Sequence, residues 1–251
     1  MFFRSAWCCD CRARRRRTRT AITVLILIIA AAAWGYGRAQ PSGTRTVAAP
    51  PKRSRAARTA PAAKGSAPSA AWQDLSWTDF HGIQLPVSAS AGPRDTRGGL
   101  ASGFTDTPRG ALIAAINIGV RTAAQWGPAI FGPTITRQVT GPAAAALLQA
   151  EANAYTQRRA AAHVRPGQPA GRGYAVEAAY RFAVWTPASA TVDVVTAGPG
   201  SNGTTALAST RIELIWQRGD WRVLAPPGGD WGNSATAISS MTGYTIFPGE
   251  R

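Results

Sequence analysis

Residues 20–37 constrain this chain more than any other segment, because they are eighteen consecutive residues without a charged side chain. An α-helix rises ~1.5 Å per residue, so the segment would measure about 27 Å, close to the roughly 30 Å hydrocarbon core of a bilayer. It is rich in Ile, Leu and Ala, and it ends near Trp34 and Tyr36, whose rings favour the headgroup layer. The segment is therefore predicted to be a single transmembrane helix.

Arginines gather on the N-terminal side of this segment. Those within ten residues of it are Arg12, Arg14, Arg15, Arg16, Arg17 and Arg19, whereas only Arg38 and Arg45 lie as close on the other side. The positive-inside rule places residues 1–19 in the cytoplasm as a basic tail and the chain from residue 38 onward outside. We expect a single-pass protein of the cell membrane, with Arg14, Arg15, Arg16, Arg17 and Arg19 on anionic inner-leaflet lipid and Trp34 and Tyr36 at the outer interface.

A cleaved signal peptide is the alternative interpretation of the same segment. The basic start, an apolar core of about 13 residues, and the small residues Gly37 and Ala39 before Gln40 all suit one. Arg38 between those small residues favours the uncleaved anchor. The three cysteines, Cys8, Cys9 and Cys11, all precede the segment, so the rest of the chain can form no internal disulfide. They could be lipidation sites, metal ligands or idle thiols.

The net charge of +16 is distributed unevenly along the chain. Residues 1–71 hold 14 Lys and Arg and one acid, whereas residues 72–251 hold 14 Arg and 11 acids. Electrostatic binding to DNA needs clustered cations that displace counterions from phosphates. The arginines after residue 72 are mostly single, so we expect residues 72–251 to bind no nucleic acid.

Composition separates a linker from a folded domain. Residues 38–71 consist mainly of Pro, Ala, Ser, Gly and basic residues, with Val47 as the only larger apolar side chain. Such a segment buries too little apolar surface to offset its ordering entropy, so a disordered spacer is expected. It is either a tether that contacts anionic envelope polymers or lipid headgroups, or a plain linker. Residues 72–251 are then one extracytoplasmic domain, beginning with an aromatic-rich strap.

Helix signals come first within this domain. Thr107 can cap a helix that has Pro108 at its first position. Asn117, Arg121 and Gln125 form one narrow polar stripe on this helix, and the apolar remainder predicts that the helix is largely buried. A short helix near residues 134–139 and a longer one over residues 142–163 are expected to follow.

Strand signals follow the helices. Residues 174–186 alternate with a period of two, with Glu177, Arg181 and Trp185 on the face opposite Tyr174. Residues 188–198, 205–217 and 221–227 predict three more strands, the last two joined by a tight turn at "RGD" rather than by an adhesion motif. The order predicts an α+β fold with helices packed on one face of a four-stranded antiparallel sheet.

The closing hairpin "IELIWQRGDWRVL" resembles that of the nuclear-transport-factor-2-like fold, which implies a curved four-stranded sheet. The plan of basic tail, single span, linker and domain is similar to bitopic scaffold subunits of type IV secretion and conjugative transfer systems. The pieces "FHGIQLPVSASAGP", "GFTDTPRGALIAA" and "GDWGNSATAISSMTGYTIFPG" resemble actinobacterial proteins carried on conjugative elements. These motifs concern packing and carry no chemistry.

Few residues suggest catalysis, although enzymes of the resembled fold use a cavity lined by Asp, His or Tyr. His81 and His163 stand alone, Glu177 and Arg181 suit an ion pair that Asp193 could join, and no metal-ligand spacing or phosphate-binding loop occurs. We therefore expect no catalytic, cofactor or metal residues.

The predicted function is a non-enzymatic structural subunit of a DNA-transfer or secretion apparatus. It would bind other envelope proteins or copies of itself, with Trp185 as the candidate partner contact. Two alternatives remain: a small-molecule-binding or enzymatic domain of the same fold, and an envelope protein unrelated to transfer. A deep pocket lined by several buried acids or histidines would favour the enzyme, whereas a shallow or side-chain-filled sheet face would favour the scaffold.

Overall fold

The computed structural model describes residue 72 and residues 74–248. The predicted cytoplasmic tail, transmembrane helix and linker, together with the predicted lipid contacts of Arg14, Arg15, Arg16, Arg17, Arg19, Trp34 and Tyr36, lie outside the described residues and stay predictions. None of the helices within the described part combines the length and the hydropathy needed to cross a membrane.

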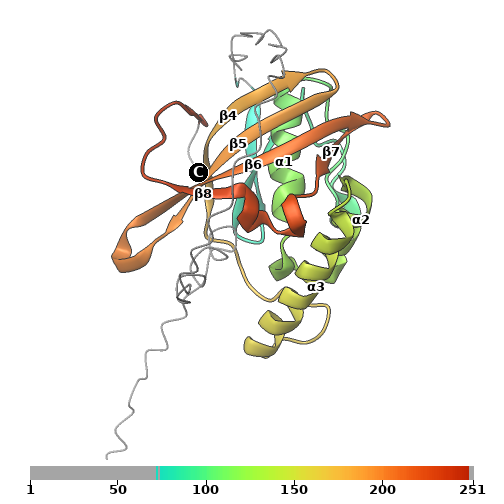
Figure 1. The fold of residues 1–251 in the computed structure, drawn as a ribbon, viewed down its shortest axis with the longest axis vertical. Helices are drawn as coiled ribbons and strands as arrows, with labels where there is room; N and C mark the ends of the chain where they lie inside the picture. The colour runs from blue at the N-terminus through green and yellow to red at the C-terminus, as the bar shows by residue number, and fades with distance from the viewer. Residues whose placement is uncertain (1–71, 73, 249–251) are drawn as a thin grey trace, which may run out of the picture.

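The described chain contains three α-helices and nine strands (Figure 1). The helices are α1 (Pro108–Arg121), α2 (Pro128–Gln138) and α3 (Ala144–Ala161). The strands are β1 (Leu75–Phe80), β2 (Ile83–Ser88), β3 (Val139–Thr140), β4 (Val176–Thr186), β5 (Ser189–Pro199), β6 (Thr205–Gln217), β7 (Asp220–Leu224), β8 (Ala235–Ile238) and β9 (Thr245–Ile246). Short 3-10 helices are η1 (Arg97–Gly99), η2 (Ala124–Trp126), η3 (Ser201–Gly203), η4 (Pro227–Gly229) and η5 (Trp231–Ser234).

Seven strands form one mixed sheet in the order β3-β7-β6-β5-β4-β9, with β8 paired to β6 beyond the end of β7. β3 runs parallel to β7, and the other pairs are antiparallel. β1 and β2 form a separate two-stranded sheet. The prediction of a curved four-stranded antiparallel sheet is therefore wrong, whereas the resemblance of the closing hairpin to the nuclear-transport-factor-2-like fold stays a prediction. The three missed strands have two to four residues, too few to show a period of two.

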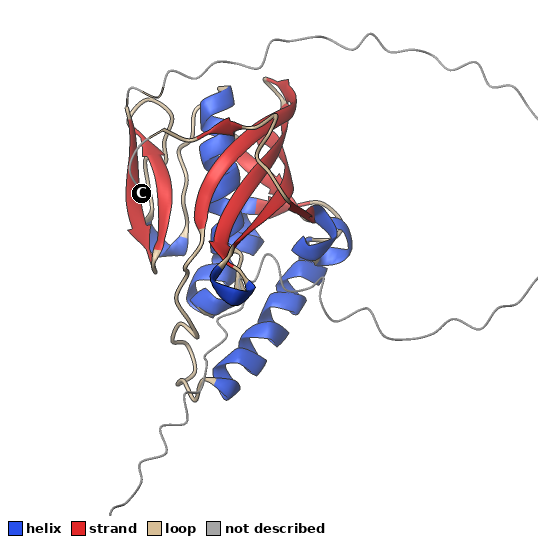
Figure 2. Cartoon of the chain, turned by 90° about the vertical axis from the view of Figure 1, so that its left-hand side faces the viewer, coloured by secondary structure: helices blue, strands red, loops and turns tan. Residues whose placement is uncertain are grey.

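Helix α1 lies between the β1–β2 hairpin and the large sheet (Figure 2). Thr107 caps it, with its hydroxyl accepting a hydrogen bond from the Gly110 backbone N–H at 3.0 Å, and eleven of its fourteen residues are buried. The polar stripe faces the hairpin, because Asn117 Nδ2 donates to the Pro86 carbonyl at 2.9 Å and Arg121 Nη1 donates to Asn117 Oδ1 at 2.8 Å. The predictions of the cap and of burial are confirmed.

Two β-bulges in β4 change which side chains face the helices. Thr196 and Val195 are consecutive on β5, but their partners on β4 are Glu177 and Ala179, which are two residues apart. A second shift of the same kind lies between Phe182 and Val184 of β4. A bulge inserts one extra residue and so reverses the alternation beyond it. Glu177 consequently lies on the helix-facing side and Arg181 on the opposite side, which corrects the prediction that they share a face.

Candidate functional site

A cavity of about 460 Å³ lies between α1, α3 and the helix-facing side of the large sheet. It exists because both helices present small side chains to this space at four-residue spacing, Ala115 and Gly119 on α1 and Ala150 and Ala154 on α3. The remaining apolar wall comes mainly from Ile83, Ile116, Val120, Trp126, Val194, Ile212 and Trp231. The sheet face is thus partly hollow rather than filled by side chains.

A polar patch interrupts the apolar wall at the sheet. Thr196 Oγ1 donates to Glu177 Oε2 at 3.1 Å, between directly opposed residues of β5 and β4. Thr210 of β6 pairs with Val194, two residues before Thr196, so it is the diagonal neighbour of Thr196 on the same face. Thr210 is only 4% exposed, and its hydroxyl has no hydrogen-bond partner among the described residues. Thr210 is one of the residues that line the cavity.

A second polar group lies at the α3 side of the cavity. Glu151 Oε2 accepts a hydrogen bond from the Ala124 backbone N–H at 2.7 Å. Burial raises the pKa of Glu151 to about 7, against the opposing effects of this bond and of the Arg158 charge, while the Asp230 charge adds to the rise. Arg158 lies two helical turns beyond Glu151, and its buried Nε has no hydrogen-bond partner in the described part of the chain. Burial also lowers the pKa of Arg158.

The two threonines of the patch make a matched pair for mutation. Thr210→Val removes a buried hydroxyl without a partner, so we expect the free energy of unfolding to rise by about 1 kcal/mol. Thr196→Val leaves the Glu177 carboxylate without that donor, so we expect a loss of about 1–3 kcal/mol. Denaturant unfolding of both variants measures the difference, and equal losses from the two would contradict the assignment of Thr210 as unpartnered.

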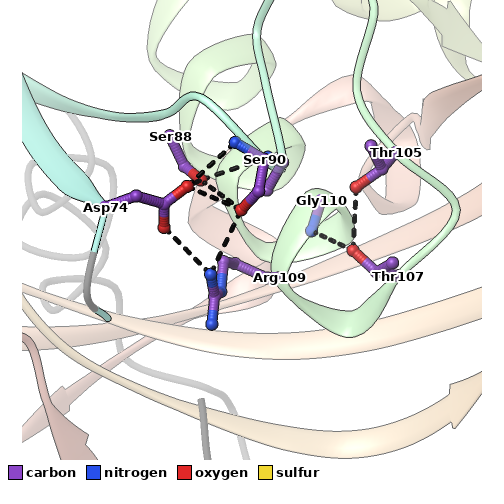
Figure 3. Close-up of polar contacts among 8 residues, drawn as sticks. Asp74, Ser88, Ser90, Thr105, Thr107, Arg109 and Gly110 are labelled. Atoms are coloured by element: carbon purple, nitrogen blue, oxygen red, sulfur yellow. Dashed lines mark hydrogen bonds and ion pairs between the residues drawn. The ribbon is translucent and has the colours of Figure 1, made fainter. Parts of the chain in front are cut away.

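A different polar cluster joins the start of the domain to α1 (Figure 3). Asp74 Oδ2 accepts hydrogen bonds from Ser90 Oγ at 2.6 Å and Ser88 Oγ at 2.7 Å, and Arg109 Nη1 lies 3.0 Å from Asp74 Oδ1. These bonds hold the pKa of Asp74 well below its usual range, with the Ser90 bond as the largest cause. A carboxylate so stabilised is a poor acceptor for a serine proton, so the cluster is suited to fixing the chain rather than to activating a nucleophile.

The residues singled out from the sequence are dispersed. Asp193 pairs with Arg181 at 2.7 Å and with Arg211 at 2.8 Å on the far face of the sheet, without Glu177. The His81 ring stacks on Trp126 with centroids 5.3 Å apart, and His163 follows the end of α3. Trp185 is half-buried and packs against Trp221 at 5.6 Å, because the second bulge turns it toward the helices. Its role as a partner contact stays a prediction.

Thr196, Thr210, Glu151 and Arg158 were not anticipated as site residues. The seven-residue spacing of Glu151 and Arg158 on one helix was the single available signal. Thr196 meets Glu177, and Thr210 becomes a neighbour of Thr196, only through strand register. The described residues include no group of three His, Cys, Asp or Glu side chains that could hold a metal ion.

Comparison with known proteins identifies only the family to which the chain belongs. No curated protein and no solved structure shows significant similarity to it. One family model matches residues 39–246, and therefore spans both the segment predicted as a linker and nearly all of the described domain. The chain thus belongs to the family described as domain of unknown function DUF8175.

Proposed function

We propose that this domain binds a small, largely apolar molecule in the cavity between α1, α3 and the large sheet. The observation that carries the proposal is the cavity itself, about 460 Å³ in volume with mainly apolar walls, to which Thr210 contributes with a buried hydroxyl that lacks a described partner. An unsatisfied buried polar group costs about 1–3 kcal/mol. A buried polar group without a partner calls for an explanation, and a bound molecule that shifts the Thr210 side chain would supply the missing hydrogen bond.

The cavity size supports the same proposal. Its volume of about 460 Å³ falls within the roughly 300–1,000 Å³ typical of small-molecule sites. Mainly apolar walls with a few polar groups are also typical of such sites. A filled sheet face would favour a scaffold, so the hollow face favours the ligand-binding alternative over scaffolding. With the predicted anchor, the protein would present a binding domain tethered outside the cell membrane.

Photolabelling of the full chain in membranes tests the proposal. A neutral alkyl diazirine should label peptides from α1, α3 and β6, which line the cavity. Ala154→Phe places a ring in the cavity and should reduce labelling by about tenfold, equivalent to roughly 1.4 kcal/mol. The control is Ala160→Phe on the same helix, at an exposed position away from the cavity. Equal labelling of the two variants would contradict the proposal.

A further inference from the structure

We propose that the ligand of this cavity is an organic acid, whose carboxylate is held by Arg158 while its apolar body fills the space between the helices and the sheet. This inference rests on the proposed function, since it assigns the chemical class of the molecule bound there. It predicts a preference among molecules that share an apolar body and differ only in their polar end.

Arg158 is the cavity residue whose guanidinium Nε lacks a hydrogen-bond acceptor among the described residues. Its Nε is buried, and within the described residues it has neither a hydrogen-bond partner nor a carboxylate within ion-pair distance. A guanidinium carries five donors and no acceptor, in a planar arrangement that matches a carboxylate. Arg172 lines the same cavity from the segment before β4 and adds a second positive charge.

The acidic residues of the cavity are engaged elsewhere. Glu177 accepts from Thr196 at the sheet, and Asp230 Oδ1 accepts from the Gly232 backbone N–H at 2.8 Å. Glu151 is the acidic residue whose charge acts on Arg158. Its Oε2, however, accepts a hydrogen bond from the Ala124 backbone N–H rather than from Arg158. A ligand carboxylate is therefore the acceptor that fits the guanidinium.

Protonation of Glu151 should couple to binding. The charged groups around it are Arg158 on its own helix, Asp230 between η4 and η5, and Arg172 and Glu177 elsewhere in the lining. The raised pKa of Glu151, about 7, means that it takes up a proton as the pH falls from 8 to 6. Neutral Glu151 no longer repels an anion, so the carboxylate ligand should bind more tightly at pH 6 than at pH 8.

Competition against the diazirine label tests the assignment on the full chain in membranes. Octanoate, 1-octanol and octylamine share one chain and differ in charge. We expect octanoate to compete about tenfold more strongly than 1-octanol, because only its carboxylate forms a charge-assisted hydrogen bond with Arg158. Octylamine should compete least, because its charge repels the guanidinium. Arg158→Gln should remove the octanoate advantage and Arg158→Lys should retain part of it. Arg159→Gln is the matched control, because Arg159 donates to the Val164 carbonyl outside the cavity.

The outcomes separate this inference from the proposed function. Labelling of the cavity with equal competition by the three compounds would overturn the organic-acid assignment and leave the binding function standing. An octanoate advantage that survives in Arg158→Gln would also overturn it. Glu151→Gln should flatten the pH dependence of octanoate competition, and an unchanged pH dependence would contradict the role of Glu151. An absence of cavity labelling would overturn both proposals.

Discussion

Trp126→Ala is expected to lower the free energy of unfolding by about 3–5 kcal/mol, the usual range for deleting a large buried aromatic side chain. Trp126 is 1% exposed, and its indole Nε1 donates to the Val120 carbonyl at 2.6 Å. Its ring stacks on His81 and meets Phe80 edge-on at 5.5 Å, so it joins the hairpin to the end of α1. Because Trp126 also lines the cavity, its removal enlarges the hollow space rather than allowing collapse.

Denaturant unfolding with a fixed slope measures this loss. Trp126→Phe retains a ring and loses the indole donor, so it should fall between the wild-type protein and the alanine variant. Tyr174→Ala is the control at an exposed aromatic position, where a change within about 0.5 kcal/mol is expected. A loss below about 1 kcal/mol in Trp126→Ala would contradict the described packing.

Asp220→Ala is expected to destabilise the domain by about 3 kcal/mol, because hydrogen bonds to a charged acceptor contribute roughly 1.5–3 kcal/mol each. Asp220 opens β7, and its carboxylate accepts from the backbone N–H groups of Gly103 at 2.9 Å and Phe104 at 3.2 Å. These bonds connect the segment before α1 to the sheet. The "RGD" sequence is thus a turn, as predicted, with Arg218 and Gly219 at positive φ.

Thermal and denaturant unfolding check the Asp220 prediction. Asp220→Asn keeps one carbonyl acceptor and should lose less stability than the alanine variant. Asp95→Ala is the matched control, because Asp95 pairs on the surface with an Arg97 side chain that is 90% exposed. Surface pairs contribute about 0–1 kcal/mol, so a loss in Asp95→Ala as large as that in Asp220→Ala would show that the internal bonds of Asp220 add nothing.

Local signals allowed the main elements to be predicted. Thr107 and Pro108 marked the start of α1 within one residue, and its nearly continuous apolar circumference predicted the burial that two flanking sheets produce. The long alternation near residues 174–186 located β4, which begins at Val176. These features depend on neighbouring residues alone, and the sequence therefore contains them.

The site could not be predicted because it depends on the register of the paired strands and on the space that small side chains leave unfilled between the helices and the sheet. The extra residue at each bulge, Ala178 and Ala183, has no composition that distinguishes it from its neighbours, yet these bulges decide which way Glu177 and Trp185 face. Thr196 and Thr210 become neighbours only when β4, β5 and β6 pair. The cavity arises from alanines and a glycine on two separate helices, and their small size has meaning only once the helices are packed.

Methyl NMR on the full chain in lipid nanodiscs tests the central claim most directly, with isoleucine δ1 methyl groups as reporters and octanoate as the titrant. Ile116 and Ile212 line the cavity, whereas Ile135 is buried elsewhere and Ile246 is 61% exposed. Binding in the cavity should shift the Ile116 and Ile212 signals in a saturable way and leave Ile135 and Ile246 unchanged. Shifts confined to Ile246, or no saturable shift at Ile116 and Ile212, would contradict a ligand site between α1, α3 and the sheet.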